Sequence, residues 1–188
     1  METIIKNLLE DTIKAFDNIT HISGIIKHKD VHIFIKTPVL NYQIQISNQN
    51  QKEINLIENV LNIHLININS NKIKEKNNNQ NVYNNILEFI PEDVYINFIN
   101  KYQKTLSTKI NISCKYNQLL FDNIIINANS LKFNYPSVAC IEYLKLFKIF
   151  SLFQNNRTKI YLNSNNSEIF KLKHYYNKNI VLIYEHNN

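Results

Sequence analysis

The chain has 188 residues, of which 44% are hydrophobic, enough to bury a core in one ordinary domain or two small ones. A single glycine, Gly24, excludes glycine-rich phosphate loops of both the Walker and the dinucleotide-binding type. The net charge of +6 lies in residues 91–188, because residues 1–90 hold nine lysines and nine carboxylates; a polyanionic partner for the second half and simple solubility both account for this asymmetry.

The first half of the chain predicts two helices and several short strands. Residues 2–17 form an amphipathic helical pattern whose apolar face consists of Ile4, Leu8, Leu9, Thr12 and Phe16. The further elements expected here are a hairpin of strands 21–28 and 31–36 around Lys29-Asp30, a strand at 41–47, a helix at 52–61, and strands at 62–69 and 82–90. Residues 70–81 form a polar low-complexity loop between the last two strands.

Residues 91–106 predict an amphipathic helix in the middle of the chain. Pro91 suits the first helical position, and two carboxylates follow it at the positive end of the helix dipole. The apolar face consists of Val94, Phe98, Ile99, Tyr102 and Leu106. The opposite face consists of Asn97, Asn100, Lys101 and Lys104. This face is either an ordinary solvated surface or a surface for phosphates.

After this helix the order of the first half recurs. The expected elements are strands 109–115 and 118–126 flanking Tyr116-Asn117, a strand at 130–135 in which Leu131, Phe133 and Tyr135 alternate with polar residues, a helix at 138–150 with Ser137 as a candidate N-cap, and strands at 157–163, 168–175 and 179–185. Helix, hairpin, strand, helix and strands thus occur twice with a repeat of about 90 residues. We therefore predict an α+β protein with two similar domains, residues 1–90 and 91–188, each with two helices packed on antiparallel sheet.

Three stretches resemble the sliding DNA clamp family, which proliferating cell nuclear antigen typifies. Residues 30–46 resemble the second and third strands of a clamp, residues 109–121 the first hairpin of its second domain, and residues 143–184 the inner helix and last three strands of that domain. The resemblance covers most of the chain as a pattern of residue types, in a divergent and shortened form. It implies a DNA clamp-like fold and a non-enzymatic processivity or scaffold factor of DNA replication, with no cofactor.

In this family each domain gives two helices to the inner wall of a ring that encloses duplex DNA. The resemblance therefore implies a DNA-binding role for the lysines that would face this channel: Lys6, Lys14, Lys52, Lys101, Lys104, Lys145 and Lys148. We favour the four that belong to the basic half, where contacts to phosphates would be independent of base sequence and sensitive to salt. Glu142 shares a face with Lys145 and Lys148, which weakens the case for these two.

The family also docks partner peptides on its outer face, and the matching positions here are Val39, Leu40, Tyr184 and His186. The resemblance implies a homo-oligomeric ring or a clamp-like hetero-assembly, closed head to tail, with DNA polymerase or other replication proteins as partners. It places the protein in the nucleus, a viral factory or an organelle. Two departures put peptide docking and ring closure in question: the interdomain connector shrinks to Ile90-Pro91-Glu92, and Glu185-His186 replaces the expected Ala-Pro.

No arrangement of side chains predicts catalysis or a metal site. His28 and His32 are four residues apart in a hairpin, which is not the helical His pair of a metalloprotease. The carboxylates Asp122, Glu142 and Glu168 are scattered, with no pairing as acid and base. Cys114 and Cys140 follow no metal spacing, and we interpret them as small buried residues in a reducing compartment. No apolar run approaches the ~20 residues of a membrane span, and the acidic N-terminus is unlike a signal peptide, so no membrane partner is expected.

Other functions stay open beside the clamp. The 21 tyrosines and phenylalanines with interleaved lysines would suit a basic single-stranded nucleic-acid-binding protein, although most lie at inward positions that core packing explains. A structural or assembly subunit whose basic half meets RNA or an acidic protein is a second alternative. A clamp-derived, viral-type transcription or assembly factor without sliding activity is a third. The excess of asparagine, isoleucine and lysine over arginine reflects an AT-rich genome and says little about function.

Overall fold

The computed structural model describes residues 1–15, 18–38, 41–68, 83–101, 109–134, 136–167 and 170–186. The chain divides into two compact units: unit 1 comprises Met1–Asn78 with Asn177–Ile183, and unit 2 comprises Asn79–Tyr176 with Tyr184–Asn188. The last strand, β13 (Ile180–His186), therefore contributes residues to both units. A boundary between independent domains at residue 90 stays a prediction.

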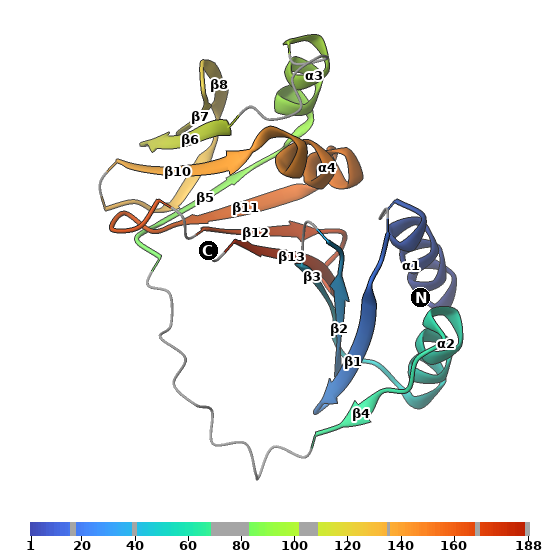
Figure 1. Cartoon of the computed structure of the whole chain (residues 1–188). Helices are drawn as coiled ribbons and strands as arrows, with labels where there is room; N and C mark the ends of the chain where they lie inside the picture. Colours follow the sequence, from blue (N-terminus) through green and yellow to red (C-terminus); the bar gives the residue numbers. More distant parts are fainter. Residues whose placement is uncertain are drawn as a thin grey trace. The chain divides into compact units, whose positions relative to one another are not determined.

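Unit 1 combines two helices with an antiparallel sheet. Its elements are α1 (Glu2–Ala15), β1 (His21–Lys27), β2 (Asp30–Lys36), β3 (Asn41–Ile46), α2 (Gln51–Leu61), β4 (Ile66–Asn67) and the first four residues of β13. β1 pairs antiparallel with β2 and β2 with β3, while the two-residue β4 lies parallel beside β1. Both helices lie on the same face of this sheet, next to each other (Figure 1).

The buried face of α1 includes Leu8, Leu9 and Thr12 as predicted, with Ile5 in place of Ile4. Ile5, Leu8, Leu9 and Thr12 are buried and follow the i, i+3, i+4, i+7 spacing of one helical face. The assignment of Ile4 to this face is wrong, because its side chain is 44% exposed. Phe16 lies outside the described residues.

The first hairpin forms as predicted, with its turn one residue earlier. Lys27 pairs with Asp30, so Asp30 begins β2 and the turn consists of His28 and Lys29. His28 has a φ of 59°, the left-handed conformation that a two-residue hairpin turn requires. In the described part of the chain, the non-glycine residues with positive φ are Asn18, His28, Asn48, Asn62, Asn117 and Asp122. Asparagine thus provides most of the left-handed positions in this glycine-poor chain.

Gly24 lies where β1 meets the segment after α2. A Cβ built on Gly24 would overlap Cδ2 of Leu65, a buried side chain, so glycine permits this close approach. The predicted strand at 62–69 is largely wrong: only Ile66 and Asn67 pair as β4. Leu65, rather than a long strand, covers this part of the sheet.

A capping box defines the start of α2. The side chain of Asn50 accepts a hydrogen bond from the Glu53 backbone N–H at 3.0 Å, and the Glu53 carboxylate accepts one from the Asn50 N–H at 3.1 Å. These two bonds satisfy N–H groups that a helix leaves without partners at its first turn. The helix ends at Asn62, whose φ is 51°.

Replacing Asn50 by alanine is expected to lower the free energy of unfolding of unit 1 by about 1 kcal/mol, because the first turn of α2 loses its cap. Urea unfolding followed by circular dichroism measures this change. Asn59→Ala, at an exposed position inside the same helix, is the matched control and should leave stability unchanged or slightly raised. Equal losses in the two variants would contradict a capping role for Asn50.

Unit 2 consists of two antiparallel sheets and a helix pair. Its elements are β5 (Asn85–Phe89), α3 (Glu92–Lys101), β6 (Lys109–Lys115), β7 (Gln118–Phe121), β8 (Ile124–Asn127), β9 (Asn129–Lys132), β10 (Ser137–Glu142), α4 (Tyr143–Phe153), β11 (Arg157–Leu162), β12 (Phe170–Tyr175) and the end of β13. One sheet has the order β12-β11-β5-β9 within this unit, and the other has the order β10-β6-β7-β8 (Figure 1).

The predicted helix at 138–150 begins too early. Residues Ser137–Glu142 form strand β10, antiparallel to β6, and the helix starts at Tyr143. Burial alternates along β10, so that Ala139 and Ile141 face the core while Val138 is 50% exposed. Ser137 is therefore no N-cap; its buried hydroxyl accepts a hydrogen bond from Asn85 at 2.7 Å.

Two other strand predictions in this unit need correction. The predicted strand 118–126 is interrupted at Asp122, which has a φ of 53°, and becomes β7 and β8. The predicted strand 130–135 is the shorter β9, in which Leu131 is 49% exposed and so does not point inward. Tyr135 lies outside the described residues. The loop 70–81 also falls outside them.

Four phenylalanines form the centre of unit 2. The Phe150 ring lies 6.0 Å from Phe89, 6.4 Å from Phe98 and 5.7 Å from Phe121, measured between centroids. Phe98, Phe121 and Phe150 are fully buried. Phe98 and Phe150 come from α3 and α4, whereas Phe89 comes from β5 and Phe121 from β7, so this cluster joins the helix pair to both sheets of the unit.

A buried polar pair lies beside this cluster. The Thr158 hydroxyl donates to the Asn156 carbonyl at 3.0 Å and lies 2.7 Å from Nδ1 of His174. Since the hydroxyl has a single proton, Nδ1 of His174 is the donor in the second bond. Burial of His174 lowers the pKa of its imidazole from 6.5 to about 3, so the ring is neutral in the folded protein.

Candidate functional site

The helix pair of unit 1 carries more negative than positive charge. Nζ of Lys6 lies 3.9 Å from Glu10, and Nζ of Lys52 on α2 lies 3.6 Å from Glu2 on α1. Lys14 is exposed in the last turn of α1. These are three lysines, whereas α1 and α2 together carry five carboxylates: Glu2, Glu10, Asp11, Glu53 and Glu58. The formal charge of the two helices is therefore 3 − 5 = −2, which disfavours phosphate binding on this pair alone.

The helix pair of unit 2 is more basic, mainly through α4. Residues 143–153 hold Lys145 and Lys148 and no carboxylate. Lys145 is 20% exposed and lies 3.4 Å from Glu142, whereas Lys148 is exposed. Lys101 is the last residue of α3, and only its backbone is described. Lys104 lies outside the described residues.

Aromatic contacts hold α3 and α4 together. Tyr95 stacks on Phe147 with a centroid distance of 5.2 Å, and Phe98 packs against Tyr143 at 5.4 Å. Val94 and Phe98 are buried as predicted, while Ile99 is 36% exposed. The helices therefore form a rigid support for the lysines on their outer surface.

The predicted peptide-docking positions are only partly visible. Val39 and Leu40 lie outside the described residues, and the side chain of His186 is not described. Tyr184 is 2% exposed and its ring lies 6.0 Å from that of Phe170. Burial and the nearby Glu142 raise the pKa of its phenol. In this structure Tyr184 packs inside unit 2.

A second cationic surface, which the sequence reasoning missed, lies on one sheet face of unit 2. It consists of Arg157 and Lys159 on β11 and Lys171 and Lys173 on β12. These cations alternate with buried residues along each strand, so all four point to the same side. We call these four side chains the basic sheet face. The alternation in RTKIYL and FKLKHY was the available signal, because period-two charge in a strand places every charge on one face.

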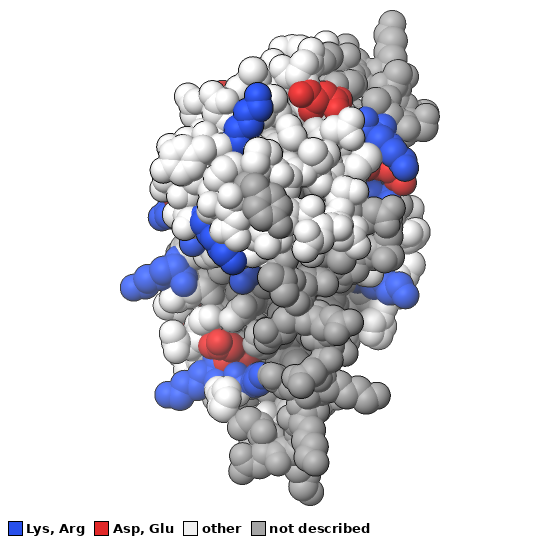
Figure 2. Space-filling view, turned by 90° about the vertical axis from the view of Figure 1, so that its left-hand side faces the viewer, with Lys and Arg blue, Asp and Glu red and all other residues white. Residues whose placement is uncertain are grey.

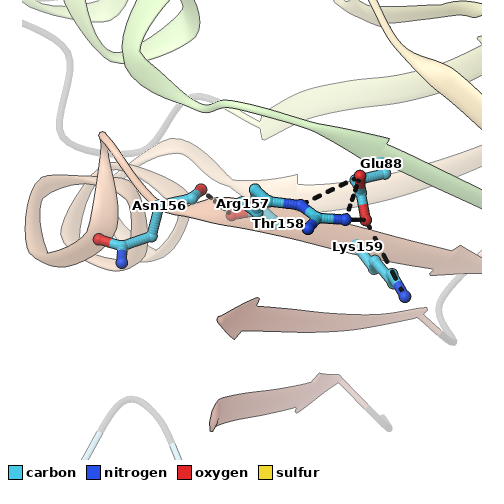
Figure 3. Close-up of polar contacts among 5 residues, drawn as sticks. All are labelled: Glu88, Asn156, Arg157, Thr158 and Lys159. Atoms are coloured by element: carbon cyan, nitrogen blue, oxygen red, sulfur yellow. Dashed lines mark hydrogen bonds and ion pairs between the residues drawn. The ribbon is translucent and has the colours of Figure 1, made fainter. Parts of the chain in front are cut away.

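Glu88 on β5 lies directly opposite Lys159 and forms ion pairs with two cations of the basic sheet face. Its two carboxylate oxygens each accept a hydrogen bond from Nη2 of Arg157 at 2.8 Å, and Nε of Arg157 donates to Oε1 at 3.2 Å (Figure 3). Lys159 approaches the same carboxylate at 3.9 Å. This forked arrangement is the strongest ion-pair geometry that arginine offers.

Tyrosines support the three lysines of this face. The ammonium groups lie over ring centroids: Lys159 over Tyr175 at 5.0 Å, Lys171 over Tyr83 at 5.0 Å, and Lys173 over Tyr161 at 5.5 Å. Lys171 also pairs with Glu185 at 3.1 Å. These contacts orient the lysines, and one face of each ring lies under an ammonium group.

An open hollow of about 560 Å³ lies beside Arg157 in unit 2. Its lining includes Glu88, Asp93, Asn117 and Arg157. Glu88 is already engaged by Arg157, so the hollow offers no paired carboxylates for acid–base chemistry. Among the described residues no group of three or more His, Cys, Asp or Glu side chains could hold a metal ion.

Figure 2 shows one face of the molecule, on which the described basic side chains are spaced apart among uncharged residues and a few acidic ones. No described helix has the length and apolar character needed to cross a membrane.

No protein-family model and no curated protein matches this sequence. Solved structures do match it. The DNA polymerase sliding clamp of Pseudomonas aeruginosa matches with a TM-score of 0.61 and 6% identity, covering 100% of this chain and 65% of that one. A putative DNA polymerase III beta subunit of Eubacterium rectale gives 0.60 and 9%, covering 100% and 64%. The Helicobacter pylori beta clamp bound to a DNA ligase peptide gives 0.53 and 10%, covering 99% and 63%.

This chain thus spans slightly less than two thirds of the length of these clamps. The match extends along the whole chain, including both helix pairs and their sheets. Identities of 6 to 10% establish similarity of fold and not of activity. The α+β architecture and the clamp resemblance predicted from sequence are confirmed at this level: the chain has the fold of the sliding DNA clamps.

Proposed function

We propose that this protein is a non-enzymatic clamp-like factor that holds duplex DNA inside a closed oligomer. The observation that carries the proposal is the match of the entire chain to sliding clamps with a TM-score of 0.61. Because each protomer spans only part of a clamp chain, several copies joined head to tail would complete a ring. Such a protein needs no catalytic group or cofactor.

Within the ring, DNA contact falls to lysines on the helices. The leading residues are Lys145 and Lys148 on α4, Lys101 at the end of α3, and Lys104, because the helices of unit 2 carry fewer carboxylates than those of unit 1. Lys6, Lys14 and Lys52 are secondary contributors, since carboxylates lie beside two of them. Contacts of this kind position DNA without reading its bases.

The proposed factor would also dock peptides of partner proteins. The Helicobacter pylori clamp binds a peptide of DNA ligase, and a comparable peptide of a polymerase or other replication protein would reach Val39, Leu40 and His186 here. The buried Tyr184 would contribute by supporting strand β13. The sites of DNA replication in a nucleus, viral factory or organelle are the expected location.

Topology gives the direct test of this function. The protein should have the mass of a closed oligomer by native mass spectrometry. Loaded protein should stay on nicked circular DNA in high salt and should leave when the circle is cut, since encirclement survives loss of ionic contacts. Equal retention on circular and linear DNA would refute encirclement, and it would favour a clamp-derived factor that does not slide.

Replacing Lys101, Lys104 and Lys148 together by glutamate is expected to weaken duplex binding and to flatten its salt dependence. If each lysine contacts one phosphate, the slope of log K against log salt falls by about 3. The matched control is Lys29→Glu with Lys115→Glu and Lys178→Glu, an equal charge change at exposed lysines outside the helices. Fluorescence anisotropy with a labelled duplex measures both slopes. The same flattening in both variants would assign binding to net charge instead of the helices.

A further inference from the structure

The arrangement of like charges on the basic sheet face is unusual. Lys159 and Lys173 are directly opposite each other in the β11–β12 register, and Lys171 follows two residues from Lys173 on the same strand. Like charges directly opposite across an antiparallel pair destabilise a sheet. Burial lowers the pKa of Lys173 most, and Lys171 and Lys159 lower it further, while Glu185 acts in the opposite direction.

Among the described residues, carboxylates form ion pairs with Arg157, Lys159 and Lys171 but not with Lys173. Glu88 binds Arg157 and approaches Lys159, and Glu185 binds Lys171. Lys173 forms no ion pair within 4 Å in the described part of the chain. An anion placed over Lys173 would have Lys159 opposite it on the neighbouring strand and Lys171 two residues away on the same strand. The surface around Lys173 therefore complements a negatively charged ligand.

We propose that the basic sheet face of unit 2 binds an acidic segment of a protein partner, held in an extended conformation along β12. Lys171 and Lys173 point to the same side of the strand, so their spacing is that of alternate strand residues, about 6.8 Å. An extended peptide with a carboxylate at every second position repeats with this spacing. Lys159 adds a third contact from the neighbouring strand.

The tyrosines favour a peptide over a single-stranded nucleic acid. Stacking of bases requires open ring faces, but one face of each of Tyr83, Tyr161 and Tyr175 has an ammonium group over it. The Tyr83 hydroxyl also donates to Glu185 at 2.9 Å, which holds that ring in place. The proposal does not depend on DNA encirclement, because the basic sheet face belongs to the strands and not to the helices.

Peptide binding to the full-length protein tests this inference. The probe is a labelled twelve-residue peptide with glutamate and serine alternating, measured by fluorescence anisotropy in 50 mM salt. The variant carries Lys159→Gln, Lys171→Gln and Lys173→Gln, which keep side-chain length and remove the charges. We expect this variant to bind about tenfold more weakly, as the loss of three partly exposed ion pairs implies.

Controls separate the peptide from other polyanions. The matched control variant loses the same charge elsewhere and should leave peptide binding nearly unchanged. It carries Lys29→Gln, Lys115→Gln and Lys178→Gln. The triple variant of the face should unfold at equal or higher urea, because like-charge repulsion is removed. Equal weakening in the two triple variants would overturn the proposal. A second result would also overturn the proposal: oligo-dT binds more tightly than the peptide, and the triple variant of the face loses this binding. The basic sheet face would then be a nucleic-acid surface.

Discussion

Replacing Phe150 by alanine is expected to lower the free energy of unfolding of unit 2 by about 3 to 5 kcal/mol. The ring of Phe150 is fully buried and lies within 6.4 Å of Phe89, Phe98 and Phe121. Its loss removes apolar contact and leaves a cavity that neighbours from a helix and two sheets cannot all fill. Urea unfolding followed by circular dichroism and tyrosine fluorescence measures the change.

Phe34→Ala provides the matched control for this experiment. Phe34 on β2 is 38% exposed, so the same truncation leaves no closed cavity and should cost clearly less. The two units need not unfold together, so the loss is read from the transition of unit 2. Similar losses for Phe34 and Phe150 would contradict the central position of the phenylalanine cluster.

Acid is expected to destabilise unit 2 through His174. The pKa of this imidazole is about 3 in the folded protein and 6.5 in a model peptide. The unfolded state therefore binds the proton more readily between these values. The contribution of the neutral His174 to the stability of unit 2 is fully present above about pH 6.5 and is lost as the pH falls towards 3. The loss is about 1.4 kcal/mol per pH unit and about 4 to 5 kcal/mol in all.

His174→Asn isolates this contribution. The asparagine amide can take the place of Nδ1–H and donate to Thr158, but it does not titrate. The variant is less stable at pH 7 because it fills less of the buried site. Its loss of stability between pH 6.5 and pH 4.5 should nevertheless be smaller than that of the original protein by about 2.7 kcal/mol. Parallel pH profiles, measured by urea unfolding, would show that His174 is not responsible.

Local patterns in the sequence predicted most elements of the fold. The periodicity of residues 2–15 and 92–101 was sufficient for the helices, and alternation was sufficient for β3. The start of α4 was not predictable in this way. Residues 138–142 are mostly apolar and fit a strand or a helix, and pairing of β10 with β6 decides between them. This pairing joins segments far apart in the chain, where local propensity gives no information.

For the candidate sites, too, the sequence indicates which face of a strand or helix a side chain occupies but not which side chains of other elements lie beside it. Alternating charges in β11 and β12 are readable in the sequence, but the register that places Lys159 opposite Lys173 is not. The inward position of His174 follows from the alternation of β12, whereas its Thr158 partner comes from the neighbouring strand. Lysines on helices could be listed in advance, yet their neighbouring carboxylates, such as Glu2 beside Lys52, required the packing of two helices.

The left-handed asparagines also affect the chain before it folds. Asn48, Asn62 and Asn117 have φ values of 51° to 59°, in turns where glycine is the usual residue. Glycine would adopt these angles without strain, but it would give the unfolded chain more conformational freedom. This freedom stabilises the unfolded state by about 0.4 to 1 kcal/mol per site. With a single glycine in 188 residues, this protein loses less backbone entropy at its turns. An asparagine-rich composition thus narrows the unfolded ensemble as well as shaping the turns.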